Sequence, residues 1–121
     1  MNERRVVITG MGCVTPAGND VRSTWEALVA GRGAARTVAK AVESRMQCTI
    51  GAEVTDFRPP ALKQDVTRLA RCTQLAMAAA MEAAADAGLP GNVDLARAGV
   101  LAGTGIGDGA EHVRTAIPTP A

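Results

Sequence analysis

The chain has 121 residues, of which 47% are hydrophobic and 21% are charged, and its formal net charge is +1. This composition is typical of a globular sequence with one domain at most. The near-neutral charge disfavours a nucleic-acid groove or an anionic membrane as the main partner. No apolar run approaches the ~20 residues that span a bilayer, and the N-terminus does not resemble a secretory signal. We therefore expect a cytoplasmic protein.

Aromatic residues and cysteines are both scarce. One Phe, one Trp and no Tyr cannot build a stacking platform for single-stranded nucleic acid. Cys13, Cys48 and Cys72 are odd in number and widely spaced, which matches neither a disulfide framework nor a C-x-x-C metal clip. We expect reduced thiols that are mostly buried, as free cysteines usually are.

The chain begins with a predicted strand. The β-branched run from Arg4 to Thr9 is apolar enough for a strand that is buried on both faces. A glycine-rich loop is expected over Gly10 to Asn19. A first helix is then predicted over Val21 to Ala30, capped by Asn19 or Asp20. Its apolar side chains recur at helical spacing, at Val21, Trp25, Leu28 and Val29.

The middle of the chain holds the strongest helix signal. Gly31 to Gln47 has no persistent period and is expected to be irregular, and Cys48 to Val54 is predicted as a second strand. Thr67 to Ala87 is dominated by Ala, Leu and Met and is closed by Gly88, so we predict a long helix there. Its polar side chains share one sector, which leaves the rest of the surface apolar: Arg68, Arg71, Gln74, Glu82 and Asp86.

The C-terminal part supplies a third predicted strand, Ala98 to Gly103, and a glycine-rich loop, Thr104 to Gly109. The tail, residues 110–121, has no pattern and is expected to be irregular. Strands that alternate with helices predict an α/β layered fold, a sheet covered by helices. Three short strands and one small helix cannot cover so apolar a long helix. We therefore expect residues 1–121 to form one incomplete domain.

The first strand and loop also invite a nucleotide-binding interpretation, since dinucleotide folds hold pyrophosphate at such a turn. However, Gly10, Gly12 and Gly18 do not form a G-x-G-x-x-G set, and Pro16 interrupts the turn. Short-chain reductases are the nearest rival, but they use a Tyr-x-x-x-Lys pair and this chain has no Tyr.

Four motifs in order resemble the N-terminal half of β-ketoacyl-acyl-carrier-protein synthases, the condensing enzymes of fatty-acid and polyketide synthesis. The family opens with R-R-V-V-I-T-G-x-G, then a P-x-G-N turn and T-W-x-x-L. Its central helix reads like R-x-x-x-x-T-Q-L-A and later D-A-G-L, before a G-[ST]-G-I-G-G loop. The matching segments are Arg4 to Gly12, Pro16 to Asn19, Thr24 to Leu28, Arg68 with Thr73 to Ala76, Asp86 to Leu89, and Gly103 to Gly107. Asp108 stands where the family usually has Gly.

The resemblance implies a thiolase-like fold that is dimeric and extends an acyl chain by decarboxylative Claisen condensation. The substrates would be acyl and malonyl thioesters of an acyl carrier protein, and neither a metal nor an organic cofactor would be needed. In the family a Cys at a helix N-terminus takes the acyl group and two His assist. These lie downstream of the Gly-Ile-Gly loop. No catalytic residue is therefore assigned to this chain, neither the three cysteines nor the lone His112.

The same resemblance implies a substrate-binding role for the glycine-rich loop. The Ile of this loop lines the acyl pocket in the family, so Ile106 with Gly105 and Gly107 are the expected substrate-binding residues. An alternative is that Ile106 is only a packing residue. Two classes of function stay open: a ketosynthase, inactive over these residues alone, or a non-catalytic chain-length-factor-type partner in a ketosynthase heterodimer.

Overall fold

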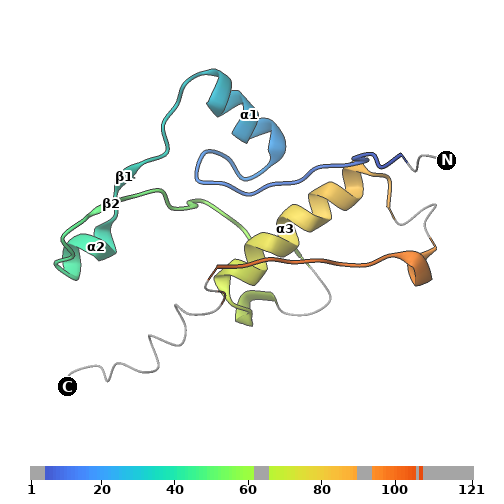
Figure 1. Ribbon diagram of the computed structural model, residues 1–121. Coiled ribbons are helices and arrows are strands. Elements are labelled where there is room, and N and C mark those ends of the chain that lie inside the picture. Colours follow the sequence, from blue (N-terminus) through green and yellow to red (C-terminus); the bar gives the residue numbers. More distant parts are fainter. Residues whose placement is uncertain (1–4, 62–65, 90–93, 106, 108–121) are drawn as a thin grey trace.

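The computed structural model describes residues 5–61, 66–89, 94–105 and 107 of the chain. In chain order its elements are α1 (Val21–Val29), β1 (Arg36–Thr37), α2 (Ala39–Glu43), β2 (Ile50–Gly51), η1 (Val66–Arg68), α3 (Arg71–Asp86) and η2 (Leu95–Arg97), where η marks a short 3-10 turn. Helix α3 lies between two extended segments, and the ribbon of β1 and β2 projects away from it with α2 (Figure 1). The fold is therefore open around α3.

Helix α1 begins where a side chain caps it. Asp20 Oδ1 accepts the backbone N–H of Ser23 at 2.6 Å, which decides between the two predicted caps. Gly31 follows the helix with a φ of +64°, a left-handed conformation that costs Gly little. The predicted helix is confirmed. The hydrogen bond from the Ser23 backbone also lowers the pKa of the Asp20 carboxyl from its usual 3.8.

Replacing Asp20 with Ala should weaken α1 by about 0.5–2 kcal/mol, because the Ser23 N–H loses its acceptor. The folded-state pKa is lowered, so the contribution of the cap is present above the unfolded value of 3.8 and is lost as the pH falls through the folded value. NMR chemical shifts over Val21–Val29 would report the helicity. Asp20→Asn, which keeps an acceptor oxygen, should retain most of it without this pH dependence. Equal helicity in the wild type and Asp20→Ala at neutral pH would contradict the capping role.

Helix α3 is the long predicted helix, but it starts later than expected. The first residues of the predicted span instead form η1, and Ala70 precedes α3 in an extended conformation. Gln74, predicted on a polar face, is buried and its Nε2 donates to the Leu69 carbonyl at 2.7 Å. At the other end Gly88 has a φ of +71°, and Leu89 N–H donates to the Ala84 carbonyl.

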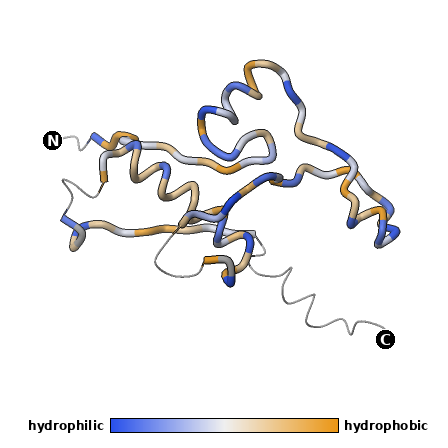
Figure 2. The backbone as a smooth tube through the Cα atoms, turned by 180° about the vertical axis from the view of Figure 1, so that it is seen from behind, coloured by the Kyte–Doolittle hydropathy of each residue, from blue (hydrophilic) through white to orange (hydrophobic). Residues whose placement is uncertain are grey.

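Two predicted strands are extended but unpaired among the described residues. The stretch 5–9 and the stretch 98–103 form no ladder, and Val6, Ile8, Val100 and Leu101 are at least 84% exposed. They flank α3 and run in the same direction, opposite to the helix (Figures 1 and 2). This is how parallel strands connected by a helix run. The prediction of strands over these two stretches is wrong. A strand needs a neighbouring backbone that hydrogen-bonds to its N–H and C=O groups, and the described residues supply none to either stretch.

The ladder that the described residues do form is short. Strands β1 and β2 pair antiparallel with Arg36 opposite Gly51 and Thr37 opposite Ile50. The predicted second strand, Cys48 to Val54, is thus confirmed for two of its residues. The expectation of irregular structure over Gly31 to Gln47 is wrong where β1 and α2 form.

The N-terminal segment lies directly on α3 because two glycines allow it. A Cβ added at Gly12 would overlap the Ala79 carbonyl and would lie 2.6 Å from the Ala83 nitrogen. At Gly10 it would lie 2.8 Å from the Ala87 Cβ. The three alanines follow one another at intervals of four residues, so they line one face of α3 up to its C-cap, Ala87. Because Gly has no side chain and Ala has only a methyl group, the backbone of the N-terminal segment can lie in contact with the backbone of α3.

Few side chains are enclosed in this open arrangement. The buried apolar residues among those described are Ala27, Ala41 and Val66. The expectation of mostly buried thiols is wrong: Cys48 and Cys72 are exposed, and Cys13 is half-buried. Cys48 belongs to the projecting ribbon and Cys72 to the first turn of α3, and both side chains are open to solvent. No described helix has the length and apolarity needed to cross a membrane.

Candidate functional site

The glycine-rich loop follows the extended stretch 98–103. Gly107 N–H donates to Thr104 Oγ1 at 2.8 Å and Gly107 has a φ of +61°, so a tight turn closes between them. Of the predicted substrate-binding residues, Gly105 is exposed and Gly107 is partly covered. Ile106 lies outside the described residues, as do Asp108 and His112.

A cavity of about 390 Å³ lies between this loop and the start of α3. Its lining consists of small residues from both elements: Ala70, Cys72, Thr73, Ala76, Ala102, Gly103, Thr104 and Gly107. None of these carries a charge, so the cavity suits an aliphatic chain better than an anion. The loop and α3 are far apart in sequence, and the fold makes them two walls of one site.

Cys72 is the nucleophilic side chain in this lining. The helix predicted over Thr67 to Ala87 would place Cys72 in its interior, whereas Cys72 is the second residue of α3. Its Sγ lies 3.9 Å from Thr73 Oγ1. No His, Asp or Glu lines the cavity with it, so this lining holds no general base for the thiol. The described walls form an uncharged hollow that pairs no base with its thiol.

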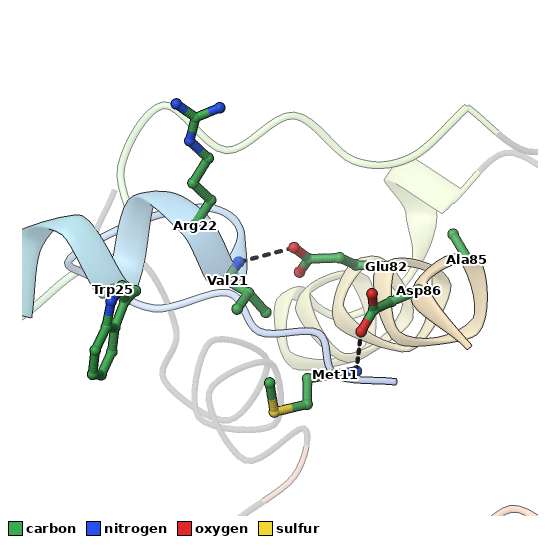
Figure 3. A pocket seen from close by; sticks show the side chains of 7 residues that line it. All are labelled: Met11, Val21, Arg22, Trp25, Glu82, Ala85 and Asp86. Atoms are coloured by element: carbon green, nitrogen blue, oxygen red, sulfur yellow. Dashed lines mark hydrogen bonds between the residues drawn. The ribbon is translucent and has the colours of Figure 1, made fainter. Parts of the chain in front are cut away.

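A second assembly joins the N-terminal loop to α3, and we call it the carboxylate clasp. Glu82 accepts two backbone N–H groups, that of Cys13 at 3.0 Å and that of Val21 at 2.9 Å. Asp86, one turn later, accepts the N–H of Met11 at 2.9 Å (Figure 3). Val21 is the first residue of α1, so Glu82 also lies at the positive end of that helix. One face of α3 therefore positions both the loop and α1.

The loop within the clasp is ordered by its own hydrogen bonds. Thr15 and Gly18 exchange backbone hydrogen bonds of 2.8 and 3.1 Å around Pro16-Ala17. Thr24 Oγ1 of α1 lies 3.0 Å from Thr15 Oγ1 and accepts from Cys13 Sγ at 3.6 Å. The P-x-G-N motif is thus a turn that connects the clasp to α1.

A concavity of about 440 Å³ opens beside the clasp. Met11, Val21, Arg22 and Trp25 line one side of it, and Glu82, Ala85 and Asp86 of α3 line the other (Figure 3). The helical spacing of the sequence predicts Trp25 on an apolar stripe but does not indicate this hollow. The role of Glu82 was also missed, although the spacing of Glu82 and Asp86 placed two acids on one face of an alanine-rich helix.

No three His, Cys, Asp or Glu side chains in the part of the chain that the structure describes come together to hold a metal ion. The chemistry available from the described residues is hydrogen bonding by the clasp and apolar contact in the two hollows.

Comparison with known proteins identifies the family of this chain. The N-terminal domain of beta-ketoacyl synthases matches residues 3–119. A 3-oxoacyl-[acyl-carrier-protein] synthase 2 of Coxiella burnetii is 41% identical over 111 residues, which cover 88% of this chain and 27% of that protein. A polyketide beta-ketoacyl synthase of Streptomyces rimosus, named for oxytetracycline, is 42% identical over 107 residues, 86% of this chain and 25% of that protein.

The crystal structure of a beta-ketoacyl synthase from Burkholderia phymatum STM815 superposes with a TM-score of 0.60 at 32% sequence identity. The match covers 74% of this chain and 23% of that structure. The chain thus spans about a quarter of the length of these relatives. The nucleotide-binding interpretation receives no support from these comparisons. The chain belongs to the beta-ketoacyl synthase family, and its partial α/β fold is the N-terminal part of a thiolase-like domain.

Proposed function

We propose that this chain is the N-terminal part of a β-ketoacyl-acyl-carrier-protein synthase, an acyltransferase that joins acyl and malonyl thioesters with loss of carbon dioxide. The observation that carries the proposal is the family match over residues 3–119, together with relatives named as 3-oxoacyl-[acyl-carrier-protein] synthases. The partner would be an acyl carrier protein in the cytoplasm, and the completed enzyme would be a homodimer or a ketosynthase heterodimer. Relatives from fatty-acid and polyketide synthesis have similar identity, so the proposal covers both substrate classes.

In this proposal the glycine-rich loop binds the acyl chain. The uncharged cavity between the loop and α3 has the small walls that an aliphatic chain needs. Gly105 and Gly107 would let the backbone pass close to the substrate, and Ile106 would contact the acyl chain. The nucleophile and its two His would come from other parts of the enzyme, since the described cavity pairs no base with a thiol.

A chimera tests the proposed function. Residues 3–119 would replace the matching segment of the Coxiella burnetii synthase, which is 41% identical. We expect the chimera to condense acyl and malonyl carrier-protein thioesters, and the 121-residue chain alone to show no condensation. A folded chimera without activity would contradict the proposal. Acylation of Cys13, Cys48 or Cys72 in the isolated chain faster than a free thiol at the same pH would contradict the assignment of catalysis elsewhere.

Replacing Ile106 with Phe in this chimera should restrict the acyl pocket. Overpacking costs roughly 1–3 kcal/mol, so acylation by long primers should fall about tenfold or more while acetyl transfer is less affected. Steady-state kinetics with primers of increasing length would measure the change. Ile106→Val, which removes one methylene-sized group, is the control and should not disfavour long primers. An equal loss for short and long primers would make Ile106 a packing residue only.

A further inference from the structure

Thr104 closes the glycine-rich loop with its side chain. Its Oγ1 accepts the Gly107 N–H at 2.8 Å, and both residues line the cavity of about 390 Å³. Thr and Ser form such turns by bonding to backbone groups a few residues away. The bond joins residues three positions apart, so it depends on no element that is distant in sequence. The loop wall of the cavity is therefore shaped by a local hydrogen bond.

The same hydroxyl pairs a polar donor in an uncharged lining. In the described part of the chain, Thr104 Oγ1 is the acceptor of the Gly107 N–H. Without this acceptor the N–H would bond to water, and an alkyl chain that covered the loop wall would have to displace that water. A backbone donor that loses its partner in this way costs free energy. The Thr104 hydroxyl thus makes the wall compatible with an aliphatic chain.

The opposite wall carries a second threonine with a different environment. Thr73 of α3 also lines the cavity, and its Oγ1 lies 3.9 Å from Cys72 Sγ. Among the described residues it accepts no backbone N–H. The two walls therefore offer the same side chain with and without a bond to the main chain, which makes Thr73 a matched comparison for Thr104.

We propose that Thr104 is a positioning residue that lets the site accept long acyl chains. By accepting the Gly107 N–H, its hydroxyl holds the loop wall closed and leaves no unpaired donor for the acyl chain to cover. This role rests on the proposed function and adds to it the group on which chain length depends. An acetyl group covers less of the wall than a long chain does, so its transfer depends less on the bond.

Thr104→Val in the chimera tests this role, because it replaces the hydroxyl with a methyl group of similar size. Acylation by long primers should fall about tenfold while acetyl transfer changes less than about twofold, since only a long chain covers the freed N–H. Thr104→Ser keeps the hydroxyl and should restore most of the long-primer rate. Steady-state kinetics with primers of increasing length would measure both. Equal losses for all primers, or no recovery with Ser, would overturn the proposal.

Two further Thr→Val substitutions serve as comparisons. Thr73→Val makes the same chemical change in the α3 wall and frees no backbone N–H among the described residues, so it should not disfavour long primers. Thr37→Val lies in β1, exposed and outside the cavity lining, and should leave all primers unchanged. A long-primer loss at Thr73→Val equal to that at Thr104→Val would overturn the proposal, because any hydroxyl of the lining would then have the same effect.

Labelling of cysteines in the full chain tests the loop wall without catalysis. Alkyl methanethiosulfonates transfer their S-alkyl group to a thiolate and release methanesulfinate. Cys72 lines the cavity, whereas Cys48 is exposed outside it. We expect the ratio of octyl to methyl labelling rates, measured by peptide mass spectrometry, to be larger at Cys72. Thr104→Val should lower this ratio at Cys72 by about threefold or more and leave it unchanged at Cys48, and Thr104→Ser should preserve it.

The two experiments separate the role of Thr104 from the proposed function. An inactive wild-type chimera would contradict the proposed function, and the labelling ratio would still decide the role of Thr104. An active wild-type chimera in which Thr104→Val leaves long primers unaffected would overturn the role of Thr104 alone. A labelling ratio at Cys72 that is the same in the wild type and in Thr104→Val would do so as well.

Discussion

Gly12→Ala is expected to detach residues 5–13 from α3. The added methyl would overlap the Ala79 carbonyl, which is backbone within a helix and cannot move aside as a side chain would. Relieving such overpacking costs roughly 1–3 kcal/mol, which is comparable to what hydrogen bonds from Met11 and Cys13 to the clasp contribute. Hydrogen exchange at the Met11 and Cys13 amides should therefore accelerate by about tenfold or more.

Gly33→Ala is the matched control for this substitution. A Cβ at Gly33 meets nothing within 4 Å, so the same chemical change should be neutral, or slightly stabilising because Ala has fewer unfolded conformations. Gly12→Ala with the exchange rates of the wild type would show that the close approach of the two backbones is not needed to hold the segment.

Removal of the Glu82 carboxylate should break the two hydrogen bonds at the centre of the clasp, those from the Cys13 and Val21 amides. Glu82→Ala leaves the amides of Cys13 and Val21 without acceptors in a half-buried place. Each unsatisfied buried donor costs about 1–3 kcal/mol, so we expect faster exchange at both amides and a frayed first turn of α1. Glu82→Gln keeps one acceptor oxygen and should be intermediate. NMR exchange rates measured residue by residue would separate the two amides.

Glu26→Ala is the control for a lost carboxylate. Glu26 pairs with Arg22 on the exposed face of α1, and exposed ion pairs contribute about 0–1 kcal/mol. Its loss should leave the Cys13 and Val21 amides unchanged. If Glu82→Ala behaved like Glu26→Ala, the hydrogen bonds of the clasp would contribute nothing to the docking of α1.

Local signals in the sequence were sufficient for α1 and for the end of α3, but not for α2, which lies in a stretch expected to be irregular. Asp20 and Gly31 mark both ends of α1, and Gly88 marks the end of α3, because caps act through residues close in sequence. The strands could not be predicted in the same way. The run after Arg5 is as apolar as a buried strand, but pairing depends on a distant backbone, and the described residues supply none.

The same distinction applies to the candidate sites. The turn at Thr104 and Gly107 follows from local chemistry, and the family resemblance indicated the loop as a substrate wall. The cavity itself needs the start of α3, about thirty residues earlier in the sequence, as its second wall. Glu82 was visible only as one member of a polar sector, since its partners, the amides of Cys13 and Val21, have no signature in the sequence.

The clasp joins two segments that are synthesised at different times. Its three hydrogen bonds join residues that are 61, 69 and 75 positions apart. A ribosome adds about 5–20 residues per second, so the first segment is synthesised roughly 3–15 s before α3 exists to receive it. Helix formation then takes about a microsecond and adds no delay. Throughout that interval the amides of Met11 and Cys13 have no carboxylate to accept their hydrogen bonds, so the N-terminal segment is not anchored until α3 has been synthesised.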